Sequence, residues 1–187
     1  MKIIRLTTPL KESDVKKLRV GDIVTISGKI ATARDKVYAR VIAGDVLPID
    51  LHGGVIYHCG PLAKRTEKRW RIISAGPTTS ARMDPMQVEF VRRTGLRALV
   101  GKGGVDADVA DKLARLGCVY LAYTGGAGVL AASQVEGVEN VFWEELGPEA
   151  IWILKVKDFG PLVVAIDTSG DNIYLRKNNN YRKPSSH

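Results

Sequence analysis

Residues 70–123 read WRIISAGPTTSARMDPMQVEFVRRTGLRALVGKGGVDADVADKLARLGCVYLAY, and this stretch indicates the fold. Three short apolar runs are typical of strands and two longer segments are typical of helices; the strands are 70–75, 96–100 and 118–123, and the helices are 85–94 and 106–116. Strands and helices in alternation predict a parallel sheet with right-handed crossovers. We therefore expect an α/β fold with a βαβ-type centre.

The ends of the two predicted helices carry their own signals. Asp84 followed by Pro85 is a good helix opening, with Asp as the N-cap and Pro at the first helical position. Gly95 and Gly117 follow the two periodic segments, where a helix commonly ends in a left-handed residue. These signals place both helices between strands and support the alternation.

Strands are expected to flank this centre on both sides. The predicted elements are a helical turn at 12–19, a strand at 23–30, a helix from 32–35 onward, a strand at 55–57, an exposed charged connection at 63–69, and strand-like runs at 150–157 and 162–167. Gly160-Pro161 is interpreted as the turn between the last two runs. Residues 1–176 are expected to form one domain, and the polar residues 177–187 a disordered tail.

Length and composition indicate a folded, cytoplasmic protein. The chain has 187 residues, of which 45% are hydrophobic, and this content suffices for a sizeable core. The apolar pair Ile3–Ile4 is too short for a signal-peptide core, and no segment reaches the roughly 20 apolar residues needed to cross a bilayer. Cys59 and Cys118 are expected to be buried, reduced thiols.

The net charge of +8 suggests an anionic partner, and nucleic acid is the first class to consider. Positive residues are spread along the chain, with local clusters only at 64–71 and 176–183, and the aromatic residues form no stacking platform. A small anionic substrate bound by a few cations fits this distribution better. A non-catalytic, basic nucleic-acid-binding module remains the alternative from a different class.

Two loops carry the residues that could perform chemistry. In a βα arrangement, ligands gather at the carboxyl ends of the strands, where helix N-termini point amides at anions. The loop at 74–85 offers Thr78, Thr79 and Arg82, and the loop at 100–104 places Lys102 among three glycines. Together with Arg34, these cations could hold both ends of a dicarboxylate. The competing interpretation gives the threonines turn and capping roles and leaves Arg82 and Lys102 in solvent.

Two further patterns are less informative. The glycine-rich loop at 123–128 lacks both GxGxxG and a P-loop lysine, so close backbone packing is the favoured interpretation. His52, His58 and Cys59 match no common zinc spacing, so we expect them to be structural and expect no metal ligands in this chain.

At these residues the sequence resembles the β subunit, or the equivalent C-terminal domain, of class I fumarases and L-tartrate dehydratases. The resemblance extends over about residues 1–170 and is carried by Gly21-Asp22, Ser27-Gly28, TARD at 32–35, YHCGP at 57–61, AGPTTSARM at 75–83, GKGG at 101–104 and TGGA at 124–127. The AGPTTSARM and GKGG segments in this order are its most specific part.

The resemblance implies a swivelling β/β/α domain that closes over a [4Fe-4S] cluster held by three cysteines of an α subunit, with one iron open as a Lewis acid. Two cysteines cannot supply the three or four thiolates that such a cluster uses, which independently favours a partner subunit. The matching substrate-site positions are Arg34, Thr78, Thr79, Arg82 and Lys102, with Thr78 as candidate base.

The function that the resemblance predicts is a class I [4Fe-4S] fumarate hydratase, with this chain as its β subunit. The reaction is the reversible dehydration of (S)-malate to fumarate, and L-tartrate dehydration is the closest alternative. The expected assembly is a heterodimer or heterotetramer with the α subunit, active only when both are present. In isolation, the surface meant for the partner could give a homodimer.

Overall fold

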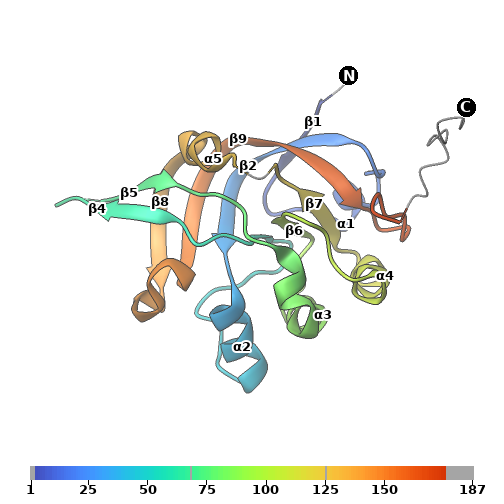
Figure 1. Ribbon diagram of the computed structural model, residues 1–187, viewed down its shortest axis with the longest axis horizontal. Helices are drawn as coiled ribbons and strands as arrows, with labels where there is room; N and C mark the ends of the chain where they lie inside the picture. The colour runs from blue at the N-terminus through green and yellow to red at the C-terminus, as the bar shows by residue number, and fades with distance from the viewer. Residues whose placement is uncertain (1–2, 68, 125, 176–187) are drawn as a thin grey trace, which may run out of the picture.

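The computed structural model describes residues 3–67, 69–124 and 126–175 (Figure 1). The strands are β1 (Ile3–Thr7), β2 (Ile23–Thr32), β3 (Val55–Tyr57), β4 (Leu62–Arg65), β5 (Trp70–Ser74), β6 (Ala98–Gly101), β7 (Val119–Ala122), β8 (Val135–Phe142) and β9 (Ile151–Ile166). The helices are α1 (Glu12–Val15), α2 (Asp35–Ala43), α3 (Asp84–Thr94), α4 (Ala107–Arg115) and α5 (Gly128–Ser133), with 3-10 turns η1 (Ser80–Met83) and η2 (Glu144–Glu149).

A parallel centre is present, as the alternating pattern predicts. β1 pairs with β2, β2 with β3, β3 with β6 and β6 with β7, all in parallel. α3 connects the hairpin region to β6, and α4 connects β6 to β7. Gly95 ends α3 in the left-handed region, with a φ of 66°. The mixed α/β class is therefore confirmed, and the carboxyl ends of β2, β3 and β6 lie along one edge.

The last strand turns this sheet into a partly barrel-like structure. β9 is antiparallel to both β2 and β7, so β2, β3, β6, β7 and β9 form a closed ring of paired strands. At Val163 the same strand faces Ile23 on one side and Ala122 on the other. β8 pairs with the first half of β9 and extends the sheet beyond the ring.

Two hydrophobic cores lie on the two faces of the ring strands. Alternate residues point to opposite faces of a strand, so Tyr57 and Val100 join one core while Ile56 and Leu99 join the other. The second core is covered by α2, α3 and α4, which line the lower side of the molecule in Figure 1. α5 lies on the opposite side, beside β5.

The prediction that residues 70–75 form the first strand of the parallel centre is wrong. β5 pairs antiparallel with β4 in a separate two-stranded sheet, and β4 lies in the segment expected to be a charged connection. The register places Ala63 opposite Ile72 and Arg65 opposite Trp70. Ala63, Ile72 and Trp70 pack against the core of the protein. This packing and the pairing with β5 make the charged segment a strand.

The prediction of a turn at Gly160-Pro161 is also wrong. Both residues lie inside the single strand β9, joined by a cis peptide bond. Gly160 has a φ of 144°, and the β2–β9 register shifts nearby, between Val24 and Ile26. A glycine at a β-bulge bends the strand without ending its ladder.

The domain boundary stays a prediction. The tail expected at 177–187 lies outside the described residues, as does the basic cluster predicted at 176–183. In the part of the chain that the structure describes, no helix has the length and apolar character to cross a membrane.

Candidate active site

Arg34 and Lys102 come from the carboxyl ends of parallel strands, whereas Thr78, Thr79 and Arg82 lie in the segment between the hairpin strand β5 and α3. Arg34 follows β2 at the start of α2, and Lys102 follows β6. Between them, β3 is followed by His58, Cys59 and Gly60. In a parallel arrangement these strand ends lie on one edge, where ligands of α/β proteins collect.

The threonine loop is joined by backbone hydrogen bonds to both of its neighbours. The Thr78 amide donates to the His58 carbonyl at 2.7 Å, and the Thr78 carbonyl accepts from the Lys102 amide at 3.3 Å. Next along the chain, the Ser80 amide donates to the Lys102 carbonyl at 3.1 Å. The structure therefore brings the two loops predicted from sequence into direct contact, with the Thr78 backbone inserted between His58 and Lys102.

Arg34 and Arg82 approach each other through a shared acid. Arg82 Nη2 donates to Asp35 Oδ2 at 2.9 Å, and Arg34 Nε lies 4.0 Å from the same oxygen. Arg34 Nε is buried and has no hydrogen-bond partner among the described residues, although such groups are normally paired. The sequence interpretation missed Asp35, which accepts a hydrogen bond from Arg82 and lies within ion-pair distance of Arg34.

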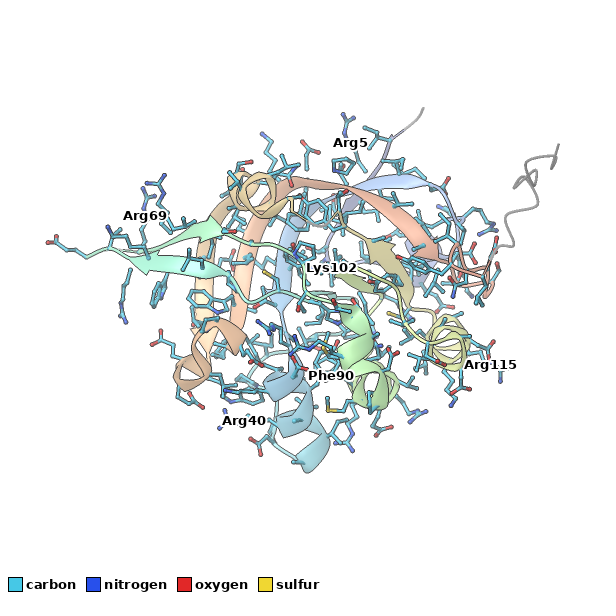
Figure 2. The ribbon with its side chains drawn as sticks, viewed as in Figure 1. Arg5, Arg40, Arg69, Phe90, Lys102 and Arg115 are labelled. Atoms are coloured by element: carbon cyan, nitrogen blue, oxygen red, sulfur yellow. The ribbon has the colours of Figure 1, made fainter. Side chains whose placement is uncertain are left out.

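The backbone at Gly60 leaves room for the Arg34 side chain. A Cβ built on Gly60 would lie 2.7 Å from Arg34 Nη1, so a larger residue here would displace the guanidinium. Thr78 and Lys102 are half-buried, whereas Thr79 and Arg82 are exposed. Figure 2 shows Lys102 near the middle of the view, above Phe90 of α3. The site is thus an open, cationic edge.

A buried polar network lies beneath the two loops, and the sequence interpretation did not identify it. His58 Nδ1 is 2.8 Å from Ser80 Oγ, and His58 Nε2 is 2.8 Å from the Tyr38 hydroxyl oxygen. The Tyr120 hydroxyl donates to Ser80 Oγ at 2.9 Å. A neutral imidazole satisfies both contacts, because one ring nitrogen donates and the other accepts.

Burial determines the charge state of this network. It lowers the pKa of His58 to about 3, with the Asp35 carboxylate opposing the shift, so the ring is neutral near pH 7. Burial also raises the pKa of Tyr120. His58 was expected to be structural, and the network agrees with that role. In the sequence, only the HCGP segment marked the place of this network. Its partners Tyr38 and Ser80 are 20 and 22 residues away from His58, so local sequence could not show that they enclose the ring.

Glycines next to Lys102 allow close packing around the network. A Cβ on Gly101 would lie 2.0 Å from Ser80 Oγ and 3.1 Å from His58 Nδ1. A Cβ on Gly104 would lie 2.6 Å from the ring of Tyr174, so the end of the described chain packs on the lysine loop. Lys102 is therefore held from both sides.

The two cysteines of this chain are poorly suited to bind a metal cluster. Cys59 and Cys118 are free and buried, and burial raises the pKa of each thiol to about 12, against the thiolate form that metals bind. Within residues 3–67, 69–124 and 126–175, no three His, Cys, Asp or Glu side chains are grouped as metal ligands.

Fold and site together define an α/β protein that gathers three cations and threonine hydroxyls at one edge of a partly closed sheet. Comparison with known protein families identifies the family of this protein. Residues 1–177 match the family described as "Fumarase C-terminus", and the chain belongs to this family.

Three named relatives extend this result. The chain is 46% identical over 175 residues to the "Putative L(+)-tartrate dehydratase subunit beta" of Methanocaldococcus jannaschii, covering 90% of each protein. It is 42% identical over 170 residues to the L(+)-tartrate dehydratase subunit beta of Escherichia coli K12, covering 90% of this chain and 85% of that one. It is 41% identical over 175 residues to the "Putative fumarate hydratase class I" of Geobacillus stearothermophilus, covering 92% of this chain but 34% of that protein.

Proposed function

We propose that this chain is the β subunit of a two-subunit [4Fe-4S] hydro-lyase that interconverts (S)-malate and fumarate. The observation that carries the proposal is the contact between the Thr78 and Lys102 loops, beside the Arg34–Asp35–Arg82 cluster. The family and the named relatives support the enzyme class. The swivelling motion, the cytoplasmic location and the heterodimeric or heterotetrameric assembly stay predictions.

The charge of the site matches a dicarboxylate. Arg34, Arg82 and Lys102 contribute three positive charges and Asp35 one negative charge, which leaves +2 opposite a substrate of charge −2. An arginine can hold a carboxylate through two parallel hydrogen bonds, and a lysine adds a compact charge. The buried, unpartnered Nε of Arg34 has a donor free for such a carboxylate.

In the proposed dehydration, a base removes the C3 proton of malate while the C2–O bond breaks. The electron pair of the C3–H bond forms the C2=C3 double bond of fumarate, and hydroxide leaves C2. Arg34, Arg82 and Lys102 stabilise the negative charge that develops on the adjacent carboxylate. The hydroxide and the proton together make the one water molecule by which malate and fumarate differ. Activation of the departing hydroxyl is assigned to the other subunit.

Thr78 is the proposed base in this chain. Its carbonyl accepts a hydrogen bond from the Lys102 amide, so this half-buried residue lies beside the lysine in the backbone. A threonine hydroxyl is a weak base at its free pKa and needs such a neighbour or a hydrogen-bonded relay. Thr78→Val should lower kcat by about 10²-fold or more with little change in KM, and Thr78→Ser should restore part of the rate. Equal kcat in Thr78→Val and the native enzyme would exclude the role.

The cluster is assigned to the α subunit. The two buried thiols of this chain are poor ligands, and the site edge offers cations, hydroxyls and a single carboxylate. The proposed division gives substrate clamping to this chain and the metal to its partner. A brown, oxygen-sensitive complex with a larger cysteine-bearing chain is the expected result of co-purification.

L-tartrate dehydration is the second candidate, because the relative from Escherichia coli that matches this chain in length carries that name. Tartrate has a hydroxyl at C3 that malate lacks, and contacts to it can come from either subunit. Steady-state kinetics of the reconstituted pair with (S)-malate, fumarate and L-tartrate separate the candidates. If kcat/KM is highest for malate and fumarate, the main proposal is supported. If kcat/KM is highest for L-tartrate, the chain is instead the β subunit of a tartrate dehydratase.

The nucleic-acid alternative has a separate test. A basic binding module should bind DNA or RNA with an affinity that falls steeply as salt rises. Its binding should depend on the Lys64–Arg71 cluster and should not change in Thr78 or Arg82 variants. Reconstituted activity together with weak, sequence-independent nucleic-acid binding is the outcome expected under the main proposal.

A further inference from the structure

The β4–β5 hairpin is an arm with one face packed firmly on the body of the protein. Ile72 is buried, and the ring of Trp70 meets Trp152 of β9 edge to face at a centroid distance of 5.1 Å. The Arg65 guanidinium lies 5.3 Å from the centre of the Trp70 ring. The tip of the arm extends to the left in Figure 1, away from α2, α3 and α4. Because Trp70 and Ile72 face the body, the alternate residues of the hairpin face away from it.

The other face of the hairpin carries apolar and positive side chains with nothing over them. Leu62 is 62% exposed and Ile73 is 43% exposed. Lys64 and Arg71 lie directly opposite each other in the register, and neither forms an ion pair with any residue that the structure describes. Like charges directly opposite each other destabilise a two-stranded sheet unless acids neutralise them.

α5 continues this apolar surface. Val129 is 75% exposed and Leu130 is 47% exposed, and Val129 and Ile73 line a common groove of about 620 Å³ between α5, β5 and β8. We call Leu62, Ile73, Val129 and Leu130 the hairpin ridge. These four are among nine exposed large apolar residues of the described chain, and they lie on the hairpin strands β4 and β5 and on α5. Exposed apolar residues on neighbouring elements are typical of a protein–protein interface.

The hairpin ridge is joined directly to the candidate active site. The Ala75 amide, at the end of β5, donates to the Gly128 carbonyl at the start of α5 at 2.9 Å. A Cβ on Gly128 would lie 3.2 Å from the Gly76 nitrogen, so the two backbones are in contact. Thr78 follows two residues later. A protein seated on the ridge therefore reaches the same edge as the threonine loop.

We propose that the hairpin ridge is the docking surface for the α subunit, which meets Leu62, Ile73, Val129 and Leu130 with an apolar patch and Lys64 and Arg71 with acidic side chains. The inference rests on the proposed function. In the Geobacillus relative the matching segment is a minor part of one longer chain, so one face of this domain has a further part of the same protein to meet.

Charge favours the α subunit over a second copy of this chain. A symmetric homodimer through the ridge would place Lys64 and Arg71 of one copy near the same residues of the other, because a two-fold interface uses one patch twice. Like charges brought together across an interface weaken it and suppress that pairing. An acidic partner surface removes this repulsion as well as the repulsion within the hairpin.

The test is binding of the purified α subunit to variants of the full-length β subunit. Ile73→Glu and Val129→Glu change exposed side chains, so both variants should keep the native melting temperature. Each should weaken α-subunit binding by at least about tenfold in isothermal titration calorimetry, because a carboxylate enters an apolar contact. The Lys64→Glu/Arg71→Glu double variant should bind more slowly, with a reduced dependence on salt.

The matched control is Val46→Glu, which places the same change at a residue 88% exposed in the loop after α2. Its affinity for the α subunit should equal that of the native chain. Native affinity in Ile73→Glu and Val129→Glu, or equal weakening in Val46→Glu, would overturn the inference. The inference would also be overturned if the ridge variants lost a homodimer but kept their affinity for the α subunit, because the ridge would then mediate self-association.

Failure of this inference is distinguishable from failure of the proposed function. Arg82→Ala should bind the α subunit normally and still have a kcat/KM about 10- to 100-fold below that of the native enzyme. Ile73→Glu should instead recover its activity when the α subunit is raised to saturation. A complex that assembles through the ridge and turns over none of the three dicarboxylates removes the proposed function and leaves the docking surface intact.

Discussion

Arg82 is held in place by one acid and is exposed, so its contribution can be measured without disturbing the fold. The 2.9 Å bond to Asp35 orients the guanidinium toward the edge that also carries Arg34. A substrate carboxylate on Arg82 would make charge-assisted hydrogen bonds, each worth about 1.5–3 kcal/mol. Arg82→Ala should therefore lower kcat/KM of the reconstituted enzyme by about 10- to 100-fold, with a higher KM.

Arg92→Ala is the control for this prediction. Arg92 is also an exposed arginine, lies on α3 and forms an ion pair with Glu89 away from the threonine loop. Its removal should leave both kinetic constants within about twofold of the native values, as expected for a surface ion pair. Matching constants for Arg82→Ala and the native enzyme would remove Arg82 from the substrate site.

His58 makes the stability of the protein depend on pH. Its pKa is lowered from 6.5 to about 3 in the folded chain, so between these values the unfolded chain binds the proton and the folded chain does not. The stabilisation is complete above about pH 6.5 and is lost as the pH falls, by up to about 1.4 kcal/mol per pH unit.

Urea unfolding of His58→Gln measures this effect. The free energy of unfolding of the native chain should drop by about 2 kcal/mol more than that of the variant between about pH 7 and about pH 5. His52→Gln, at an exposed histidine, should keep the native pH dependence. An identical slope for His58→Gln and the native chain would show that His58 is charged or solvated in the fold.

β6 positions the lysine loop through the lack of a side chain at its last residue. A Cβ on Gly101 would lie 2.0 Å from Ser80 Oγ, inside the network under the site. Gly101→Ala should therefore force the Thr78 and Lys102 loops apart and destabilise the fold by about 1–3 kcal/mol. Thermal unfolding measures the loss, and kcat/KM should fall with it.

Gly137→Ala in β8 is the corresponding control. A Cβ at Gly137 meets no described atom within 4 Å, and no positive φ is required there. Its melting temperature should equal or slightly exceed that of the native chain, because alanine reduces the freedom of the unfolded state. Equal stability of Gly101→Ala and Gly137→Ala would contradict the close packing at Ser80.

β4 and β9 show what local patterns miss. The run at 70–75 was correctly recognised as a strand, but its partner was not, because periodicity reports burial and not pairing. Gly160-Pro161 has the composition of a turn, yet the pairing of β9 with β2 continues through it. Hydrogen bonds to a neighbouring strand outweighed the local preference of two residues.

The closed ring of strands places both cysteines in the interior of the whole molecule. Cys59 and Cys118 are free and fully buried, and the pKa of each thiol is raised to about 12 by burial. Neither thiol should react with a chromogenic disulfide reagent in the native protein at pH 8, whereas both should react in guanidinium chloride. Rapid reaction of either thiol in the native state would mean that the ring opens locally.

Several features were readable without coordinates because they depend on neighbours along the chain. The α/β alternation, the end of the first predicted helix at Gly95, the reduced buried thiols and the two polar loops follow from local periodicity and residue type. The lysine loop lies at the carboxyl end of the parallel strand β6, as the topology rule requires. The threonine loop instead follows β5, which belongs to the antiparallel hairpin, so only the structure shows how Thr78 comes to lie beside Lys102. Their roles in substrate binding stay predictions.

Tertiary structure alone decided the closure of the ring by β9, the hairpin of β4 and β5, and the network of His58 with Tyr38, Ser80 and Tyr120. Each depends on atoms brought together from distant positions, as when the Thr32 hydroxyl donates to the Ala150 carbonyl across 118 residues. Local propensity carries no information about such pairs, because their energy exists only after the intervening chain has folded. Asp35 joined the site for the same reason, since its role depends on Arg82 reaching it from another strand end.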